Sequence, residues 1–381
     1  MRPRSLLPAL AAGSVLLGSA CTGSPTGTVG PSGRAGPTWR TVALPDAVSP
    51  VTLASDGTSV VVGARAADRP NPRLFVGTDA SDLRPVDLTP RSPYAFEARW
   101  FQVVTHEGRV DAVGGVRGGA HGNYRWTTWS GDAAAVAEQE QPFGVFGSYG
   151  AGDLAGLAYA GTSPVILGAW QSERTGLDIA VWTRTGARWA RQPSAGTSLA
   201  STPDALVAGR AITSRGDGLV ISGSVTRLSP GSVRVDAAVW TAPGGTGPWS
   251  RVDLPRTSDD ELAEAHAATC TPQRCLVAGS EGGRLALWEL VDGSASRLDG
   301  IPDVRLPENV PVPAPVRAGK DDVVVVPTGS RSTVLRHAGG AWSSADGPGG
   351  TPVSAVVRGD DLWVVTDDAH GAGTLSVSRV A

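Results

Sequence analysis

The sequence of 381 residues contains little of several residue types that usually carry chemistry. Lys320 is the only lysine, and there are one methionine, three cysteines and five histidines. The histidines are spread widely, and none stands in a His-x-x-x-His or comparable arrangement, so no spacing typical of metal ligands is present. We therefore expect no metal and no other cofactor. The formal net charge of −3 gives no electrostatic reason to expect a nucleic-acid partner.

The near absence of lysine makes arginine almost the only basic residue. Guanidinium groups recognise carboxylates and phosphates through paired hydrogen bonds, so this bias is compatible with anion recognition. The codon bias of a GC-rich genome explains it equally well, because Ala, Gly, Val and Pro are abundant too. Composition leaves both explanations open.

Long hydrophobic runs are also missing. The apolar stretch 6–17 follows Arg2 and Arg4, and it is short and interrupted by Pro8, which is typical of a signal peptide rather than a membrane-spanning helix. It ends in Gly18-Ser19-Ala20-Cys21, which resembles the lipobox of bacterial lipoproteins, although Gly18 stands where Leu is usual. The resemblance implies a signal peptide 1–21, lipidation of Cys21 and anchoring to the extracytoplasmic face of the cell membrane. Ordinary cleavage and secretion is the alternative.

The segment 22–37 is rich in Gly, Ser, Thr and Pro, and we interpret it as a flexible tether. The two remaining cysteines, Cys270 and Cys275, lie at the facing ends of two apolar runs. In a hairpin they would be close enough for a disulfide, which an exported protein can form. A metal site would be the alternative use of two thiols, but it would lack further ligands.

Seven apolar runs repeat about every 50 residues, each preceded by another apolar run and a tight turn. They lie at 60–63, 110–114, 165–168, 219–223, 276–279, 323–326 and 362–365. A third run follows each one, and it often carries Trp. Because nearly every residue of these central runs is apolar, each is expected to be a strand buried on both faces.

The seventh repeat ends without a fourth run, whereas 39–45 (Trp-Arg-Thr-Val-Ala-Leu-Pro) resembles 249–255, the fourth run of the fourth repeat. The N-terminal segment would therefore complete the last sheet, as in known seven-bladed β-propellers, and remove an exposed edge. We predict an all-β fold: a seven-bladed β-propeller of four-stranded blades over 38–381, closed by the N-terminal strand in the last blade.

This resemblance is architectural and implies no activity. Thr185-Gly-Ala-Arg-Trp189 is similar to the second half of the Asp box of sialidase-like propellers, but the Ser and Asp are absent. The dipeptides of WD40 repeats are missing, and a kelch-like double glycine before paired aromatic residues occurs only once, near Gly114-Gly115.

Periodic placement predicts packing roles for most of the twelve tryptophans, including Trp182, Trp240 and Trp288 at one third-run position. Trp170 lies outside this pattern, and we expect it in a loop that could contact a ligand. The acidic pairs Asp321-Asp322 and Asp360-Asp361 are expected to serve turn formation.

Propeller geometry indicates which face to examine. Loops between the second and third strands converge on one face with the linkers between blades, and loops on a rigid scaffold commonly bind ligands. The candidate binding residues on this face are Arg117, His121, Trp170, Glu173, Arg174, Asp367 and His370.

Two hypotheses of function follow. The first is a monomeric, lipid-anchored binding scaffold for a protein or an envelope polymer. The second is a glycan-acting hydrolase or lyase similar to sialidase propellers, for which Glu173, Asp367 and His370 are the acid–base candidates. The second needs two carboxylates, or a carboxylate and a histidine, roughly 5–10 Å apart at the channel mouth.

Overall fold

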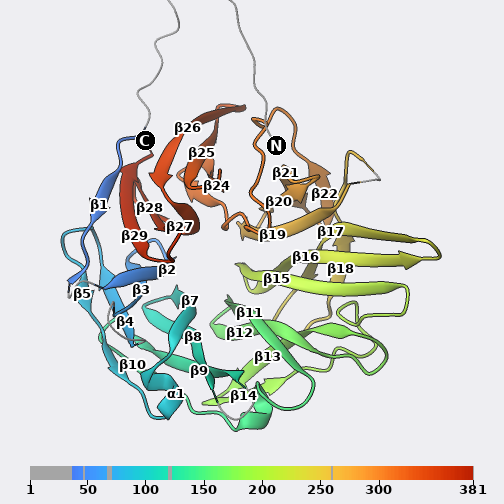
Figure 1. The fold of residues 1–381 in the computed structure, drawn as a ribbon, viewed down its shortest axis with the longest axis horizontal. Coiled ribbons are helices and arrows are strands. Elements are labelled where there is room, and N and C mark those ends of the chain that lie inside the picture. Colours follow the sequence, from blue (N-terminus) through green and yellow to red (C-terminus); the bar gives the residue numbers. More distant parts are fainter. Residues whose placement is uncertain (1–36, 46–47, 67–70, 119–121, 259–260, 381) are drawn as a thin grey trace, which may run out of the picture. The chain divides into compact units, whose positions relative to one another are not determined.

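A computed structural model describes residues 37–45, 48–66, 71–118, 122–258 and 261–380. Within these ranges the chain forms seven sheets arranged around a central axis (Figure 1), which we number blades 1 to 7. The prediction of an all-β, seven-bladed β-propeller is confirmed. Cys21 and the segment expected to be a tether, apart from Pro37, lie outside the described residues.

The strands follow one another outward from the centre in each blade. Blade 1 contains β2 (Ser49–Ser55), β3 (Val60–Arg65), β4 (Pro72–Gly77) and β5 (Arg84–Pro85). Blade 2 contains β7 (Arg99–His106), β8 (Arg109–Gly118), β9 (Asn123–Asp132), β10 (Ala135–Glu138) and the added strand β6 (Asp87–Thr89). Blade 3 contains β11 (Ala151–Ala160), β12 (Ser163–Gln171), β13 (Leu177–Thr185) and β14 (Arg188–Arg191). Blade 4 contains β15 (Ala205–Arg215), β16 (Gly218–Ser229), β17 (Ser232–Ala242) and β18 (Ser250–Asp253).

The remaining three blades complete the ring. Blade 5 contains β19 (Ala263–Cys270), β20 (Arg274–Glu281), β21 (Arg284–Val291) and β22 (Ser294–Arg297). Blade 6 contains β23 (Val316–Ala318), β24 (Asp321–Pro327), β25 (Arg331–Ala338) and β26 (Ala341–Gly349). Blade 7 contains β27 (Thr351–Arg358), β28 (Asp361–Asp367), β29 (Gly373–Arg379) and β1 (Arg40–Val42). Short helical turns occur at α1 (Pro93–Phe96) and η2 (Phe143–Val145), in the linkers before and after blade 2.

The seven predicted central runs all lie in second strands, from β3 to β28. Their side chains are almost fully buried, because each such strand is covered by a neighbouring blade on both faces. The buried side chains form seven clusters, one between each pair of adjacent blades. The ring is therefore held together by apolar packing between blades as well as by hydrogen bonding within them.

Closure of the ring occurs as predicted. β1 pairs antiparallel with β29, so that Arg40 lies opposite Val377 and Val42 opposite Leu375. The Val42 side chain is buried with Leu375 and Val377 in the cluster between blades 7 and 1. The outer strand of the last blade thus comes from the start of the described chain (Figure 1).

Blade 2 has an extra strand, and blade 6 has a short innermost strand. In blade 2, β6 adds a fifth strand by pairing parallel with β10. In blade 6, the innermost strand β23 has three residues, and the preceding segment contains Pro307, Pro311, Pro313 and Pro315. Proline has no N–H to donate to a strand ladder, so this proline-rich segment lines the channel without joining the sheet.

The periodic tryptophans have the packing role expected of them. Trp182, Trp240 and Trp288 are fully buried, and each indole Nε1–H donates to a backbone carbonyl in the linker that precedes its own blade. The acceptors are Val145, Ser198 and Pro255, at 2.6–3.0 Å. One buried ring therefore packs between blades and holds the linker at the same time.

The disulfide prediction is also confirmed. Cys270 and Cys275 occupy directly opposite positions in β19 and β20 and are joined by a disulfide. Among the residues that the structure describes, no helix has the length and hydrophobicity needed to cross a membrane.

Contrary to our prediction, Asp321 and Asp322 do not form the turn. The turn itself is Gly319-Lys320, since Ala318 pairs with Asp321. Both aspartates are buried at the start of β24. Asp321 accepts hydrogen bonds from Arg336, and Asp322 accepts them from Arg274 of blade 5. The pair is structural because it provides buried ion pairs, which the local sequence does not show.

Candidate functional site

The second-to-third-strand loops and the linkers between blades share one face of the ring, which we call the loop face. The structure places the described candidates there: Arg117 is the penultimate residue of β8, Glu173 and Arg174 lie between β12 and β13, Asp367 ends β28, and His370 lies between β28 and β29. His121 lies outside the described residues.

The acid–base candidates for glycan cleavage do not all come together. Glu173 belongs to blade 3, whereas Asp367 and His370 belong to blade 7. Burial raises the pKa of Asp367, and the nearby Arg65 and Arg99 counteract the rise. The Asp368 carboxylate accepts from the backbone N–H groups of His370 and Ala372, so it stabilises its own loop.

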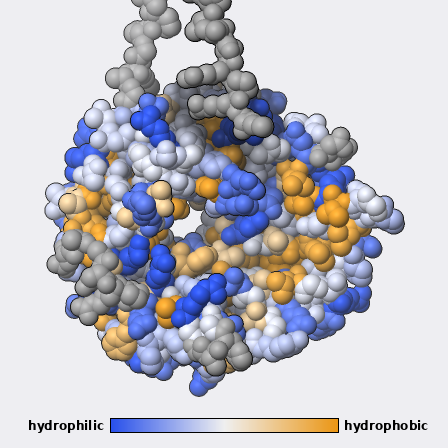
Figure 2. All heavy atoms as spheres, in the orientation of Figure 1, coloured by the Kyte–Doolittle hydropathy of each residue, from blue (hydrophilic) through white to orange (hydrophobic). Residues whose placement is uncertain are grey.

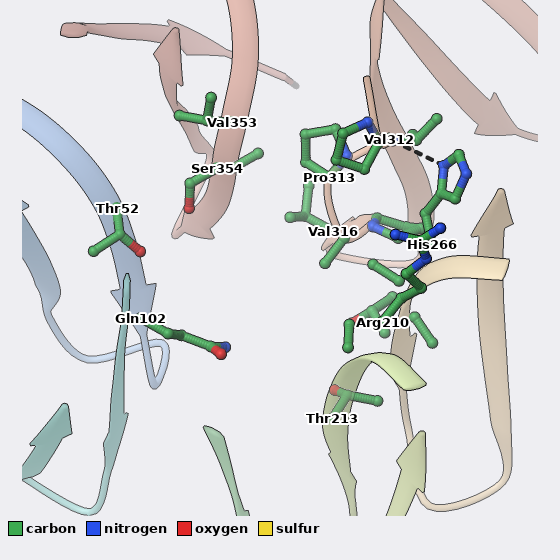
Figure 3. A pocket seen from close by; sticks show the side chains of 18 of the residues that line it. Thr52, Gln102, Arg210, Thr213, His266, Val312, Pro313, Val316, Val353 and Ser354 are labelled. Carbon is green, nitrogen blue, oxygen red and sulfur yellow. Dashed lines mark hydrogen bonds between the residues drawn. The ribbon is translucent and has the colours of Figure 1, made fainter. Parts of the chain in front are cut away.

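The central channel is a cavity of about 1120 Å³ lined by the inner strands of all seven blades and the proline-rich segment before blade 6. Figure 2 shows its opening at the centre of the ring, with hydrophilic residues along much of the rim. Thr52, Gln102 and Ser354 lie on one side and Arg210, His266 and Val312 on the other (Figure 3).

The titratable groups on this wall already have partners. The Arg210 Nη2 lies 3.0 Å from Glu264 Oε1. His266 Nδ1 accepts from the Val312 N–H at 3.0 Å (Figure 3), and its Nε2 lies 3.3 Å from the Ser280 hydroxyl. Burial lowers the pKa of His266 to about 4, so the ring is neutral and holds the proline-rich segment in place. Sequence reasoning missed this histidine because no local motif distinguishes it.

Aromatic residues concentrate on blade 2 and its two linkers. The chain has five Phe and four Tyr, and all but Phe75 and Tyr159 lie between residues 94 and 149. Several of them remain exposed, whereas the tryptophans of the blade-to-blade packing are buried. A concentration of exposed aromatic side chains on one part of a soluble surface is typical of a binding site.

Four of these Phe and Tyr side chains, together with Arg125 and Trp126, form what we call the blade-2 cluster: Tyr94, Phe101, Tyr124, Arg125, Trp126 and Phe143. The Trp126 ring centroid lies 4.2 Å from that of Tyr124 and 5.6 Å from that of Phe101, with Phe101 edge-on. The Arg125 guanidinium lies 4.5 Å from the Phe143 ring centroid and 5.8 Å from that of Tyr94. Phe101 also lines the channel, so the cluster extends from the channel to the outer part of blade 2.

Gly115 makes room for this arrangement. The Tyr124 ring lies over the β8 backbone, and its hydroxyl donates to the Gly115 carbonyl at 3.0 Å. A Cβ at position 115 would lie 2.5 Å from Tyr124 Cε1 and would also collide with the Arg125 carbonyl. The Gly114-Gly115 pair thus has a local steric function rather than marking a kelch repeat.

Arginine side chains surround the cluster. Arg117 lies directly opposite Tyr124 in the β8–β9 ladder, and Arg99 lies opposite Gly115 in β7–β8. Both side chains are exposed. Burial raises the pKa of Tyr124, and the positive charges of Arg99 and Arg117 partly offset the rise.

Trp170 differs from its prediction, since it is the penultimate residue of β12 rather than a loop residue. Its ring packs edge-on to Trp182, and the Arg191 guanidinium lies 4.7 Å from its centroid. Trp170 and Glu173 line a separate cavity of about 430 Å³ on blade 3. Its buried Asp178 is already hydrogen-bonded to Ser194 and the Ser201 N–H. Arg174 does not line this cavity.

The fold and this face define a seven-bladed β-propeller with an aromatic and arginine-rich sector on its loop face. No known protein family and no curated protein matches the chain. Among the described residues, no group of three His, Cys, Asp or Glu side chains could hold a metal ion.

Solved structures show the fold alone. The polysaccharide lyase Uly1 is similar with a TM-score of 0.55 and 8% identity, over 88% of this chain and 91% of the lyase. The propeller domain of the trilobed protease from Pyrococcus furiosus is similar with a TM-score of 0.53 and 7% identity, over 88% of this chain and 94% of that domain. A prolyl endopeptidase is similar with a TM-score of 0.51 and 13% identity, over 88% of this chain but 47% of the enzyme. The propeller domain of the Pyrococcus furiosus protease has an open velcro topology, whereas in the present protein β1 closes the ring.

Proposed function

We propose that this protein is a lipid-anchored propeller on the extracytoplasmic face of the cell membrane, and that it binds a carbohydrate polymer of the cell envelope. The observation that carries the proposal is the blade-2 cluster. The apolar C–H faces of sugar rings pack on aromatic rings, while phenol, indole and guanidinium groups hydrogen-bond the hydroxyls. The cluster offers both kinds of contact, on strands β7 and β9 and on the two linkers that flank blade 2.

Burial supports a role for the cluster beyond folding. Phe143 is 55% exposed, Phe101 43% and Tyr94 36%. Leaving these rings in water forgoes about 1.5–3 kcal/mol each that full burial would contribute. Elsewhere in the ring the large aromatic side chains are packed between blades, as with Trp240 and Trp288.

Binding is supported better than glycan cleavage. The channel's Glu264 and His266 are engaged by Arg210 and Val312, and Glu173 lies on a different blade from Asp367 and His370. The likeness to a polysaccharide lyase is one of fold, at 8% identity.

The binding test uses the full-length chain and a panel of soluble polysaccharides, with affinities measured by titration calorimetry. Phe101→Ala and Phe143→Ala should each weaken binding at least tenfold, because each removes an exposed ring from the cluster. Val233→Ala is the matched control, since Val233 is 66% exposed on blade 4. Unchanged affinities in both Phe variants, or no binding to any polysaccharide, would refute the proposed function.

The anchor is tested separately by the Cys21→Ala variant. Lipidation of Cys21 predicts that the unaltered protein sediments with membranes, and that the variant appears in the soluble exported fraction. An equal distribution of the two proteins would overturn the lipid anchor and leave the binding proposal standing.

A further inference from the structure

We infer that the bound polymer is anionic, and that Arg99, Arg117 and Arg125 recognise carboxylate or sulfate groups on it. The inference rests on the proposed function, because it specifies the ligand of the same blade-2 cluster. It adds a charge requirement that aromatic stacking alone does not impose.

The first argument is the unused hydrogen-bonding capacity of Arg99 and Arg117. No hydrogen bond or ion pair engages either side chain within the part of the chain that the structure describes. Both are exposed, and both lie near Tyr124. A guanidinium group presents five N–H donors in a planar fork that matches a carboxylate or a sulfate. Two such forks beside an aromatic surface suit a sugar ring that carries an acidic substituent.

The second argument is the position of Arg125. Its guanidinium stacks on Phe143 and faces Tyr94, so the side chain is ordered before any ligand arrives. Its Nε is buried without a hydrogen-bond partner. A preorganised cation binds an anion with a smaller loss of side-chain entropy than a mobile one.

The third argument is the local charge balance. Glu138 lies near Arg125, but it is buried and accepts from the Arg91 and Ser92 N–H groups and the Ser92 hydroxyl. Asp153 is exposed and near enough to influence Tyr124. Glu140 is exposed and lines the same pocket as Arg125, and Asp367 lies near Arg99. Among the described residues none of these carboxylates forms an ion pair with Arg99, Arg117 or Arg125, so the three guanidinium groups remain available to an anionic ligand.

The test compares polymers that differ only in charge. Polygalacturonate is paired with its methyl-esterified form, and dextran sulfate with dextran, on the full-length protein. We expect the charged member of at least one pair to bind at least tenfold more tightly than its neutral partner. Its affinity should fall as the salt concentration is raised. The pair that shows the preference distinguishes carboxylate from sulfate recognition.

Variants then separate the contribution of charge from that of stacking. Arg99→Gln combined with Arg117→Gln should weaken binding of the charged polymer at least tenfold more than binding of its neutral partner, because the two lost positive charges matter only to the charged polymer. Phe143→Ala should weaken both. Arg188→Gln is the matched control, because Arg188 is exposed at the third-to-fourth-strand turn on the opposite face.

The outcomes distinguish the two proposals. Equal binding of charged and neutral polymers overturns the anionic inference and leaves polysaccharide binding intact. Failure to bind any polymer overturns both. A single-stranded oligonucleotide also combines stacking with negative charge, so tighter binding of an oligonucleotide than of every polysaccharide would overturn the carbohydrate assignment.

Discussion

Blade 2 and blades 4 to 6 use the same cation in opposite ways. In blade 5, Arg274 lies 2.6 Å from Asp322 and 3.1 Å from Glu289, and similar pairs join arginines to carboxylates through blades 4 to 6. In blade 2, Arg99 and Arg117 have no such partner among the described residues. A neighbouring buried carboxylate therefore decides whether an arginine stabilises the ring or remains available for a ligand.

The largest expected effect breaks a paired arginine. Asp322→Ala removes a buried carboxylate that holds Arg274, and the free energy of unfolding should fall by about 3 kcal/mol. Urea denaturation followed by tryptophan fluorescence measures the change. Asp299→Ala removes an exposed carboxylate and serves as the control. A loss of less than about 0.5 kcal/mol would mean that the arginine–carboxylate pairs of blades 4 to 6 do not stabilise the fold.

A second, smaller effect is the pH dependence of stability that comes from His266 of blade 5. The folded pKa of His266, about 4, lies below its ordinary value of 6.5, so protonation favours the unfolded chain. Stability from this group is complete above pH 6.5 and is lost as the pH falls toward 4. Between pH 6.5 and 5 the loss should be about 2 kcal/mol.

The control for this effect is His266→Gln, which keeps an acceptor for the Val312 N–H and does not titrate. Denaturation of both proteins across pH 5 to 6.5 measures the difference in slope. The Arg210–Glu264 pair near the ring is present in both proteins, so it does not contribute to the difference. Parallel slopes would contradict the buried neutral state of His266.

The smallest effect sharpens the comparison. Arg99→Ala and Arg117→Ala should each change the free energy of unfolding by no more than about 0.5 kcal/mol, because neither exposed side chain has a hydrogen-bond or ion-pair partner among the described residues. The same urea denaturation provides the measurement. A loss above 1 kcal/mol in either variant would place that arginine among the structural ones.

Much of the fold was predictable because it depends on repeated local patterns. The second strands are recognisable since burial on both faces requires unbroken apolar runs, and closure was visible in the likeness of 39–45 to 249–255. The added strand β6 was not predictable. Its three residues, Asp87–Thr89, are mainly exposed, so they carry no hydrophobic pattern.

The site was less predictable because it is assembled from separate elements. Arg117 was identified from its loop, but its aromatic neighbours come from α1, β7, β9 and the linker after blade 2, and none carries a motif. One signal was available in the sequence: nearly all Phe and Tyr lie between residues 94 and 149. Trp170 was misplaced because β12 continues beyond its apolar run.

The pairing of β1 with β29 also sets an order of events during synthesis. Synthesis runs from the N-terminus, so β1 is made before every other strand of the ring, whereas its partner β29 is made after all of them. Arg40 can meet Val377 only when all seven blades exist. Until then β1 lacks its partner and blade 7 its outer edge. Completion of the ring therefore requires that all seven blades have been synthesised, and a chain cut short before β29 cannot close in this way.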